Sequence, residues 1–77
     1  MRQLEQLVEI REAAATGRAR ALRLAARLSQ GEVAAELGCS RAAVSRWERG
    51  RRLPRGRVAG RYLRLLETLA RVPTEVE

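Results

Sequence analysis

Residues 28–50 have the sequence LSQGEVAAELGCSRAAVSRWERG, and this stretch decides the fold of the chain. Ser29 stands three residues before a glutamate, which is the pattern of a capping box, where each side chain bonds the other residue's backbone N–H. Gly38 is suited to end the helix that starts there, because glycine adopts a positive φ without a steric penalty. Ser40 is a preferred cap for a second helix, which we expect to end at Gly50. The stretch therefore predicts two short helices joined by a tight turn.

The apolar residues of the same stretch predict how these two helices pack. A steep crossing between helices that are joined by so short a turn needs small residues at the contact, and Ala34 and Gly38 are small. Trp47 follows Val44 by three residues, which indicates a core side chain rather than a platform for stacking bases. We expect the internal apolar set to be Val33, Leu37, Cys39, Val44 and Trp47. The outward side of the second helix then carries Arg41, Ala42, Ser45, Arg46 and Arg49.

Three further helices are predicted around this stretch, at about residues 3–15, 18–28 and 58–71. Ala, Leu, Arg and Glu dominate there and no segment alternates with period two, so the chain is expected to be all-α. The expected apolar stripes are Leu4, Leu7 and Val8 in the first, Leu22, Ala25, Ala26 and Leu28 in the second, and Val58, Tyr62, Leu65, Leu66 and Leu69 in the last. A basic loop at residues 51–57 precedes the last helix, and residues 72–77 are predicted to be a frayed tail.

The formal net charge of +7 is concentrated in one third of the chain. Residues 40–64 hold nine arginines and one glutamate, whereas residues 1–17 hold two arginines and three glutamates. A concentrated basic surface favours a nucleic-acid partner, with an acidic lipid surface or an acidic protein as alternatives. All 16 basic residues are arginine, which suits phosphate and guanine recognition but also follows from a G+C-rich coding sequence.

Length and composition argue against several classes of protein. From a length of 77 residues we expect one domain and no second, ligand-sensing domain. It has no His, one Cys and no carboxylate cluster around a plausible nucleophile, so we expect neither an enzyme nor a metal or other cofactor. No apolar run suffices for a membrane span or a signal peptide, and a soluble, cytoplasmic protein is expected. Cys39 is expected to be a small buried hydrophobe in a reducing compartment.

The central stretch resembles the Cro/C1-type helix-turn-helix family of phage repressors and their bacterial relatives. The matching elements are LSQ at 28–30, VAAELG at 33–38, SR at 40–41, VSRWERG at 44–50, and Pro54. With the flanking helices, the likeness covers about residues 16–71. It implies a compact, five-helix, lambda-repressor-like DNA-binding domain, here with an extra N-terminal amphipathic helix. The expected organisation is the N-terminal helix at 1–15, the domain at 16–71 with its helix-turn-helix core at 29–50, and the tail at 72–77.

The resemblance also implies roles for the residues that match the motif. Base readout falls to the residues at and near the start of the second, recognition helix, which are Arg41, Ala42, Ser45 and Arg46. Phosphate contacts fall to Gln30, Ser40, Arg49, Arg51 and Arg52. Gln30 is also expected to brace the start of the recognition helix. Structural roles fall to Ala34, Gly38, Val44, Trp47 and an ion pair between Arg23 and Glu48. Outside the motif, Arg55 and Arg57 are expected to contact phosphate, and Arg61 and Arg64 to lie in solvent.

These observations predict a sequence-specific regulator that binds double-stranded DNA, most simply a small repressor acting as a homodimer on a palindromic operator. The alternatives are an antitoxin that autoregulates its operon and whose main partner is a toxin, an architectural DNA-binding protein without base readout, or a non-regulatory interaction module. A protein partner, if there is one, is expected to be a toxin or another regulator. Residues 1–15 lie outside the usual core of the family. They are expected either to dock on the last helix or to form part of a dimer surface. No membrane partner is expected.

Overall fold

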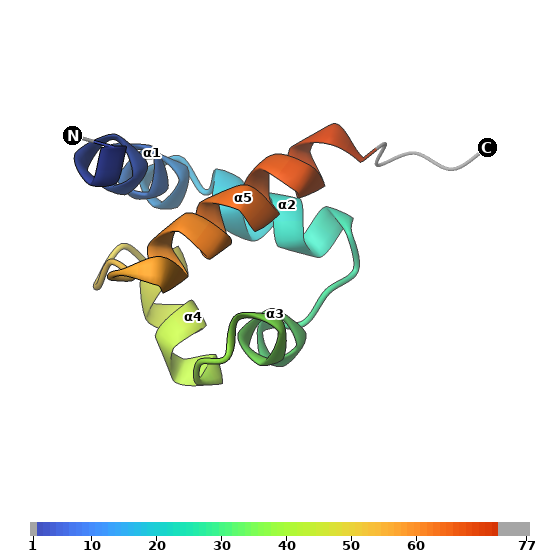
Figure 1. The fold of residues 1–77 in the computed structure, drawn as a ribbon. Coiled ribbons are helices and arrows are strands. Elements are labelled where there is room, and N and C mark those ends of the chain that lie inside the picture. Colours follow the sequence, from blue (N-terminus) through green and yellow to red (C-terminus); the bar gives the residue numbers. More distant parts are fainter. Residues whose placement is uncertain (1, 73–77) are drawn as a thin grey trace.

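The computed structural model describes residues 2–72 and builds them into five α-helices (Figure 1). These are α1 (Arg2–Ala15), α2 (Arg18–Ala25), α3 (Gln30–Leu37), α4 (Arg41–Glu48) and α5 (Arg57–Arg71). The expected all-α, five-helix fold is confirmed. Of the predicted tail at 72–77, all but Val72 lies outside the described residues. No helix within residues 2–72 is long and apolar enough to cross a membrane.

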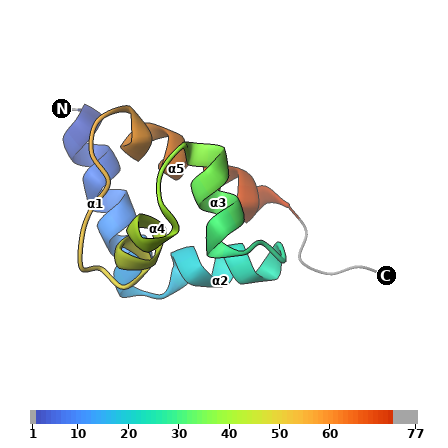
Figure 2. The same cartoon turned by 90° about the horizontal axis from the view of Figure 1, so that it is seen from below.

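The helices form two groups around one core. In Figure 1, α1, α2 and α5 lie in the upper part of the molecule and α3 and α4 in the lower part. Figure 2 shows the lower side, with α3 and α4 framed by α1, α2 and α5. Helix α5 contacts α1, α2 and α3, and α3 contacts α4. The core consists of Ile10, Ala13, Ala19, Val33, Ala34, Leu37, Val44, Trp47, Ala59, Tyr62 and Leu66. Every helix therefore contributes to the same core.

The predicted crossing of α3 and α4 is built from the expected residues except Gly38. Gly38 is exposed and an added Cβ would meet nothing within 4 Å, so glycine is required there by its φ of 73° and not by close packing. Ala34 and Val44 are buried, and so are Val33, Leu37 and Trp47, as predicted. The Trp47 ring packs on Tyr62 of α5, with ring centroids 5.0 Å apart and planes tilted by 49°. Cys39, expected to be buried, is only half-buried, and burial raises the pKa of its thiol. Helix α4 is thus anchored to α3 and to α5 through one side.

Helix α2 is shorter than its predicted range because it ends at Ala25, three residues before Leu28. Arg27 takes a positive φ of 61°, and the N–H groups of Arg27 and Leu28 bond back to the carbonyls of Leu24 and Arg23. This arrangement satisfies helix-end carbonyls and usually has glycine at the left-handed position. Because arginine stands there instead, the stop was not visible in the sequence. The expected core residue Ala25 is exposed, and Ala19 and Arg23 are buried instead.

The predicted apolar stripe of α1 was wrong in part. Ile10 and Ala13 are buried and Leu7 is half-buried, whereas Leu4 and Val8 are 61% and 60% exposed. At 3.6 residues per turn, Leu4 lies about 120° around the helix from Ile10, so both cannot face one core. Helix α1 contacts α2, α4 and α5, which is the docking expected as one alternative.

Helix α5 buries Tyr62, Leu66 and Leu69 as predicted, and Ala59 in addition. The expected stripe residues Val58 and Leu65 are only half-buried. Gly60 faces α1, where an added Cβ would lie 3.3 Å from the side-chain nitrogen of Gln6. The close approach of α1 gives a reason for glycine inside this helix.

Candidate nucleic-acid interface

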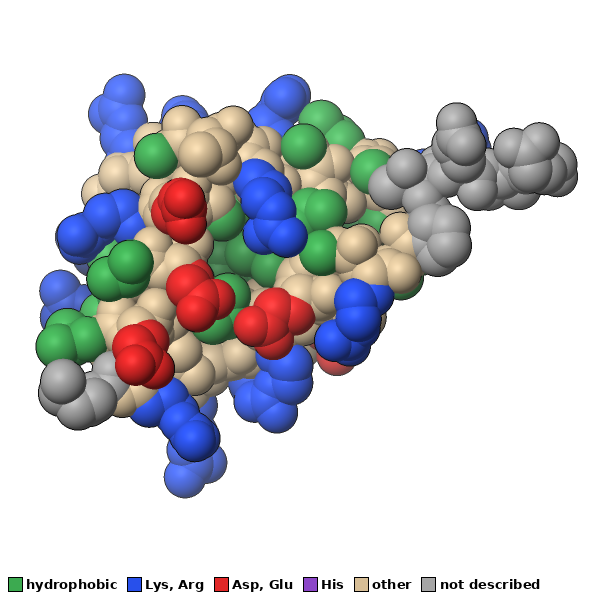
Figure 3. Space-filling view, turned by 90° about the horizontal axis from the view of Figure 1, so that it is seen from above, with side chains coloured by type: hydrophobic (Ala, Val, Ile, Leu, Met, Phe, Trp, Pro, Cys, Tyr) green, Lys and Arg blue, Asp and Glu red, His purple; other side chains and the backbone are tan. Residues whose placement is uncertain are grey.

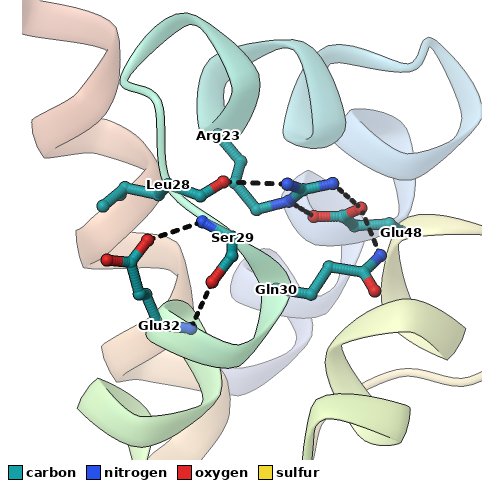
Figure 4. Close-up of polar contacts among 6 residues, drawn as sticks. All are labelled: Arg23, Leu28, Ser29, Gln30, Glu32 and Glu48. Atoms are coloured by element: carbon teal, nitrogen blue, oxygen red, sulfur yellow. Dashed lines mark hydrogen bonds and ion pairs between the residues drawn. The ribbon is translucent and has the colours of Figure 1, made fainter.

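Two capped helix starts define the lower side of the molecule. The Ser29 hydroxyl accepts a hydrogen bond from the N–H of Glu32 at 2.9 Å, and the Glu32 carboxylate accepts one from the N–H of Ser29 at 2.8 Å (Figure 4). This is the predicted capping box. The Ser40 hydroxyl accepts from the N–H of Ala43 at 3.0 Å and starts α4, also as predicted. These local bonds fix where α3 and α4 begin.

The residues predicted to read bases lie on the side of α4 that the core leaves uncovered. Because Val44 and Trp47 are buried, the opposite side of α4 is presented to solvent. Arg41, Ala42 and Arg46 are exposed and Ser45 is half-buried. Three of these residues share a shallow hollow with Gln30, whose full lining is Gln30, Arg41, Ala42 and Ser45. Arg46 stands outside this hollow, one turn further along α4 than Ala42.

The buried ion pair implied by the resemblance is present. Arg23 of α2 donates from Nε to Oε2 of Glu48 at 2.6 Å and from Nη2 to Oε1 at 3.0 Å (Figure 4). The two residues are only 7% and 8% exposed. The third guanidinium nitrogen, Nη1, donates to the carbonyl of Leu28 at 2.9 Å. The hydrogen bond to Glu48 raises the pKa of Arg23. This two-pronged geometry ties the end of α4 to α2 in a fixed orientation.

The side chain of Gln30 lies differently from the expectation. Its Nε2 donates to Oε1 of Glu48 at 3.1 Å, so it braces the end of α4 and not its start (Figure 4). The reason is that Gln30 is the first residue of α3, and the Glu48 carboxylate reaches this position through its pairing with Arg23. Glu48 thereby joins α2, α3 and α4.

The predicted phosphate-binding arginines lie along the end of α4 and the loop before α5. Gly50 takes a φ of 72° at the start of this loop, and the N–H of Arg51 bonds the carbonyl of Arg46 at 2.9 Å. Pro54 is buried and Leu53 is half-buried, so the loop is anchored by apolar contacts. The five arginines remain exposed, with Arg49 directly after α4, Arg51, Arg52 and Arg55 in the loop, and Arg57 at the start of α5. Ser40, also predicted to contact phosphate, is exposed at the start of α4.

Arg61 does not simply extend into solvent as expected. Its guanidinium donates to the carbonyl of Glu36 at 2.8 Å and to that of Leu37 at 3.4 Å. The last carbonyls of a helix lack partners within the helix and attract a cation, and α3 ends at Leu37. Arg61 is 24 residues from Leu37 and 25 residues from Glu36 in the sequence, so no local sequence pattern predicts this contact. Arg64 is exposed, as expected.

The opposite side of the molecule carries acidic as well as basic side chains. Figure 3 shows acidic side chains gathered on the upper face, with apolar and basic side chains around them. A groove between α1 and α5 is lined by three glutamates and one arginine, namely Glu9, Glu12, Glu67 and Arg18, together with Ala13, Thr16, Leu63 and Leu66. On the lower side, the exposed arginines of α4 and its following loop have no exposed acidic residue among them, because Glu48 is buried. Within residues 2–72, no three His, Cys, Asp or Glu side chains gather as metal ligands.

Comparison with protein families finds one model, described as Helix-turn-helix, which matches residues 20–70. The match begins within α2 and ends within α5, so it includes both capped helices and the arginine loop but excludes α1. Neither a curated protein nor a solved structure matches the chain.

Proposed function

Because this chain belongs to the Cro/C1-type helix-turn-helix family of DNA-binding transcription regulators, we propose that it is a small repressor that binds a palindromic operator as a homodimer. In this proposal residues 16–71 form the DNA-binding domain, with its helix-turn-helix at 29–50. The observation that carries the proposal is the hollow formed by Gln30, Arg41, Ala42 and Ser45 at the start of α4. It gathers side chains that suit base edges beside one that suits phosphate.

Base readout is assigned to the exposed side of α4. Arg41 and Arg46 donate to O6 and N7 of guanines in the major groove, because a guanidinium matches that pair of acceptors. Ala42 contacts a thymine methyl, and Ser45 contacts a base edge between the two arginines. The buried Arg23–Glu48 pair supports this assignment, since it holds α4 in one orientation relative to the other helices.

Phosphate binding is assigned to the surrounding residues. Gln30 uses one amide N–H on Glu48, which leaves its second N–H for a phosphate oxygen. The remaining phosphate contacts are assigned to Ser40, Arg49, Arg51, Arg52, Arg55 and Arg57. If each protomer neutralises roughly four phosphates, the slope of log K against log salt for the dimer is about −7. A slope near zero would contradict the electrostatic part of the proposal.

A homodimer on a palindromic site is inferred from the size of the module. One domain of this size contacts too few base pairs to find a site in a genome, and a dimer reads two half-sites about 34 Å apart. Repression follows where such a site overlaps a promoter, because the bound dimer blocks access to it.

Selection of bound sequences from random DNA tests this function. The expected result is an inverted repeat with half-sites about one helical turn apart, bound by two protomers at least about a thousandfold more tightly than random DNA. Equal affinity for selected and random DNA would mean an architectural DNA-binding protein instead. A single half-site bound by one protomer would contradict the dimer.

The exposed apolar residues of α1 favour one second candidate, an antitoxin that regulates its own operon. Leu4 and Val8 are more than half exposed, and α1 lies outside the family match. A toxin encoded beside this chain would cover them. Co-expression with the neighbouring gene product tests this candidate. A stable complex in which this chain relieves growth inhibition supports it, and independent migration of the two proteins contradicts it.

A further inference from the structure

A pocket between α1 and the loop that follows α4 gathers four arginines. They are Arg11 of α1 and Arg51, Arg52 and Arg55 of the loop, and we call this space the arginine pocket. Its apolar lining comes from Leu7, Leu53 and Pro54. In Figure 2 the loop runs beside α1, which brings these two distant parts of the chain together. The family match starts at residue 20, so it covers the loop but not Arg11.

The charge of the arginine pocket is not balanced by the protein. No acidic residue lines it, and all four arginines are exposed. Among residues 2–72, the one ion pair within 4.0 Å is that of Arg23 with Glu48, which lies elsewhere. Like charges that face one another across a pocket repel, and an anion between them removes that repulsion. Guanidinium groups favour oxyanions in particular, because their paired N–H groups match two oxygens at once.

The backbone around the arginine pocket is held in place without the arginines. Ile10 is 1% exposed and anchors α1, so the next residue, Arg11, is presented at a fixed point of the pocket rim. On the other side, Pro54 is buried and Leu53 is half-buried. The pocket is therefore formed before any anion binds.

We propose that the arginine pocket binds an oxyanion of the phosphate class and that Arg11 makes α1 part of this site. Two sources supply this chemistry, a backbone phosphate of DNA at the flank of the half-site and a free phosphate monoester. The apolar lining suits the sugar carbons that accompany the phosphate in either case. The DNA source rests on the function proposed above, whereas the free phosphate does not.

The first arm of the test uses the full chain and measures DNA affinity against salt for the wild type, Arg11→Gln and Arg71→Gln. Arg71 is exposed at the far end of α5, so its variant has the same charge change away from the pocket. The slope of log K against log salt is negative, and each lost phosphate contact makes it less steep. If DNA supplies the phosphate, Arg11→Gln makes the slope of a dimer less negative by about 2 more than Arg71→Gln does. Thermal melting of both variants checks that they fold like the wild type.

The second arm titrates inorganic phosphate into the protein without DNA, at constant ionic strength set by chloride. Shifts of the amide NMR signals of Leu53 and Gly56 in the wild type, lost in Arg11→Gln but kept in Arg71→Gln, support the site with a free phosphate as its ligand. If wild-type DNA binding itself fails, this arm still decides the proposal. Equal salt slopes for the two variants together with no phosphate-dependent shifts would overturn it.

Discussion

The α3–α4 pair and α1 are attached to the rest of the molecule by different interactions. The pair has capped starts, and Glu48 joins its end to α2 and α3 through hydrogen bonds of 2.6 to 3.1 Å. No hydrogen bond or ion pair within residues 2–72 joins α1 to another helix, and its attachment is apolar, chiefly through Ile10 and Ala13. Directional bonds fix orientation, whereas apolar burial depends mainly on area. Helix α4, to which we assign base readout, is thus held by directional bonds.

Breaking the directional attachment is expected to have the largest effect. Glu48→Ala leaves the Arg23 charge buried without its partner, which costs about 3 to 5 kcal/mol of unfolding free energy. Urea unfolding measures this loss. The double variant Arg23→Met with Glu48→Leu is the control, since it removes both charges and is expected to recover most of the stability. A loss below about 1 kcal/mol for Glu48→Ala would mean that the pair is not desolvated as described.

The apolar attachment of α1 is tested by truncating one side chain on its buried side and one on its exposed side. Ile10→Ala removes a fully buried side chain and is expected to cost about 2 to 5 kcal/mol. Val8→Ala, on the exposed side of the same helix, is expected to change stability by no more than about 0.5 kcal/mol. Thermal or urea unfolding compares the two. If the two variants lost equal stability, Val8 would belong to the buried side of α1, as the sequence pattern had predicted.

The small contact between α3 and α4 is tested by adding volume. Ala34→Leu is expected to destabilise the fold by about 1 to 3 kcal/mol, because the buried crossing has no room for a larger side chain. The matched control is Ala35→Leu, which adds the same atoms at the next, exposed position of the same helix. If both variants keep the wild-type melting temperature, Ala34 does not lie at the crossing.

The smallest expected effect concerns helix ends that share a left-handed residue. Arg27→Gly is expected to stabilise the protein by up to about 1 kcal/mol, because glycine adopts a φ of 61° without strain. Gly38→Ala, at a φ of 73°, is expected to lower stability by about the same amount. Melting temperatures of the two variants should therefore move in opposite directions. A lower melting temperature for Arg27→Gly would show that its side chain contributes more than its backbone strain costs.

The same contrast explains what the sequence could and could not predict. The starts of α3 and α4 and the turn at Gly38 depend on residues within four positions of one another, so their pattern is visible locally. The buried side of α1 and the contact of Arg61 with the end of α3 depend on where other helices lie, which no local pattern encodes. The Arg23–Glu48 pair spans 25 residues and was expected only from the family resemblance.

The central claim is that the exposed side of α4 reads bases while the following loop holds phosphates. The most direct test measures the affinity of Arg46→Ala and Arg52→Ala for a selected site and for random DNA. Arg46→Ala is expected to lose about 1 to 3 kcal/mol of binding free energy on the selected site, and to relax the preference at one base pair. On random DNA the variant is expected to lose only the binding free energy that comes from removing one positive charge. Arg52→Ala is expected to weaken binding to both DNAs alike. Equal losses on selected and random DNA for both variants would contradict the claim.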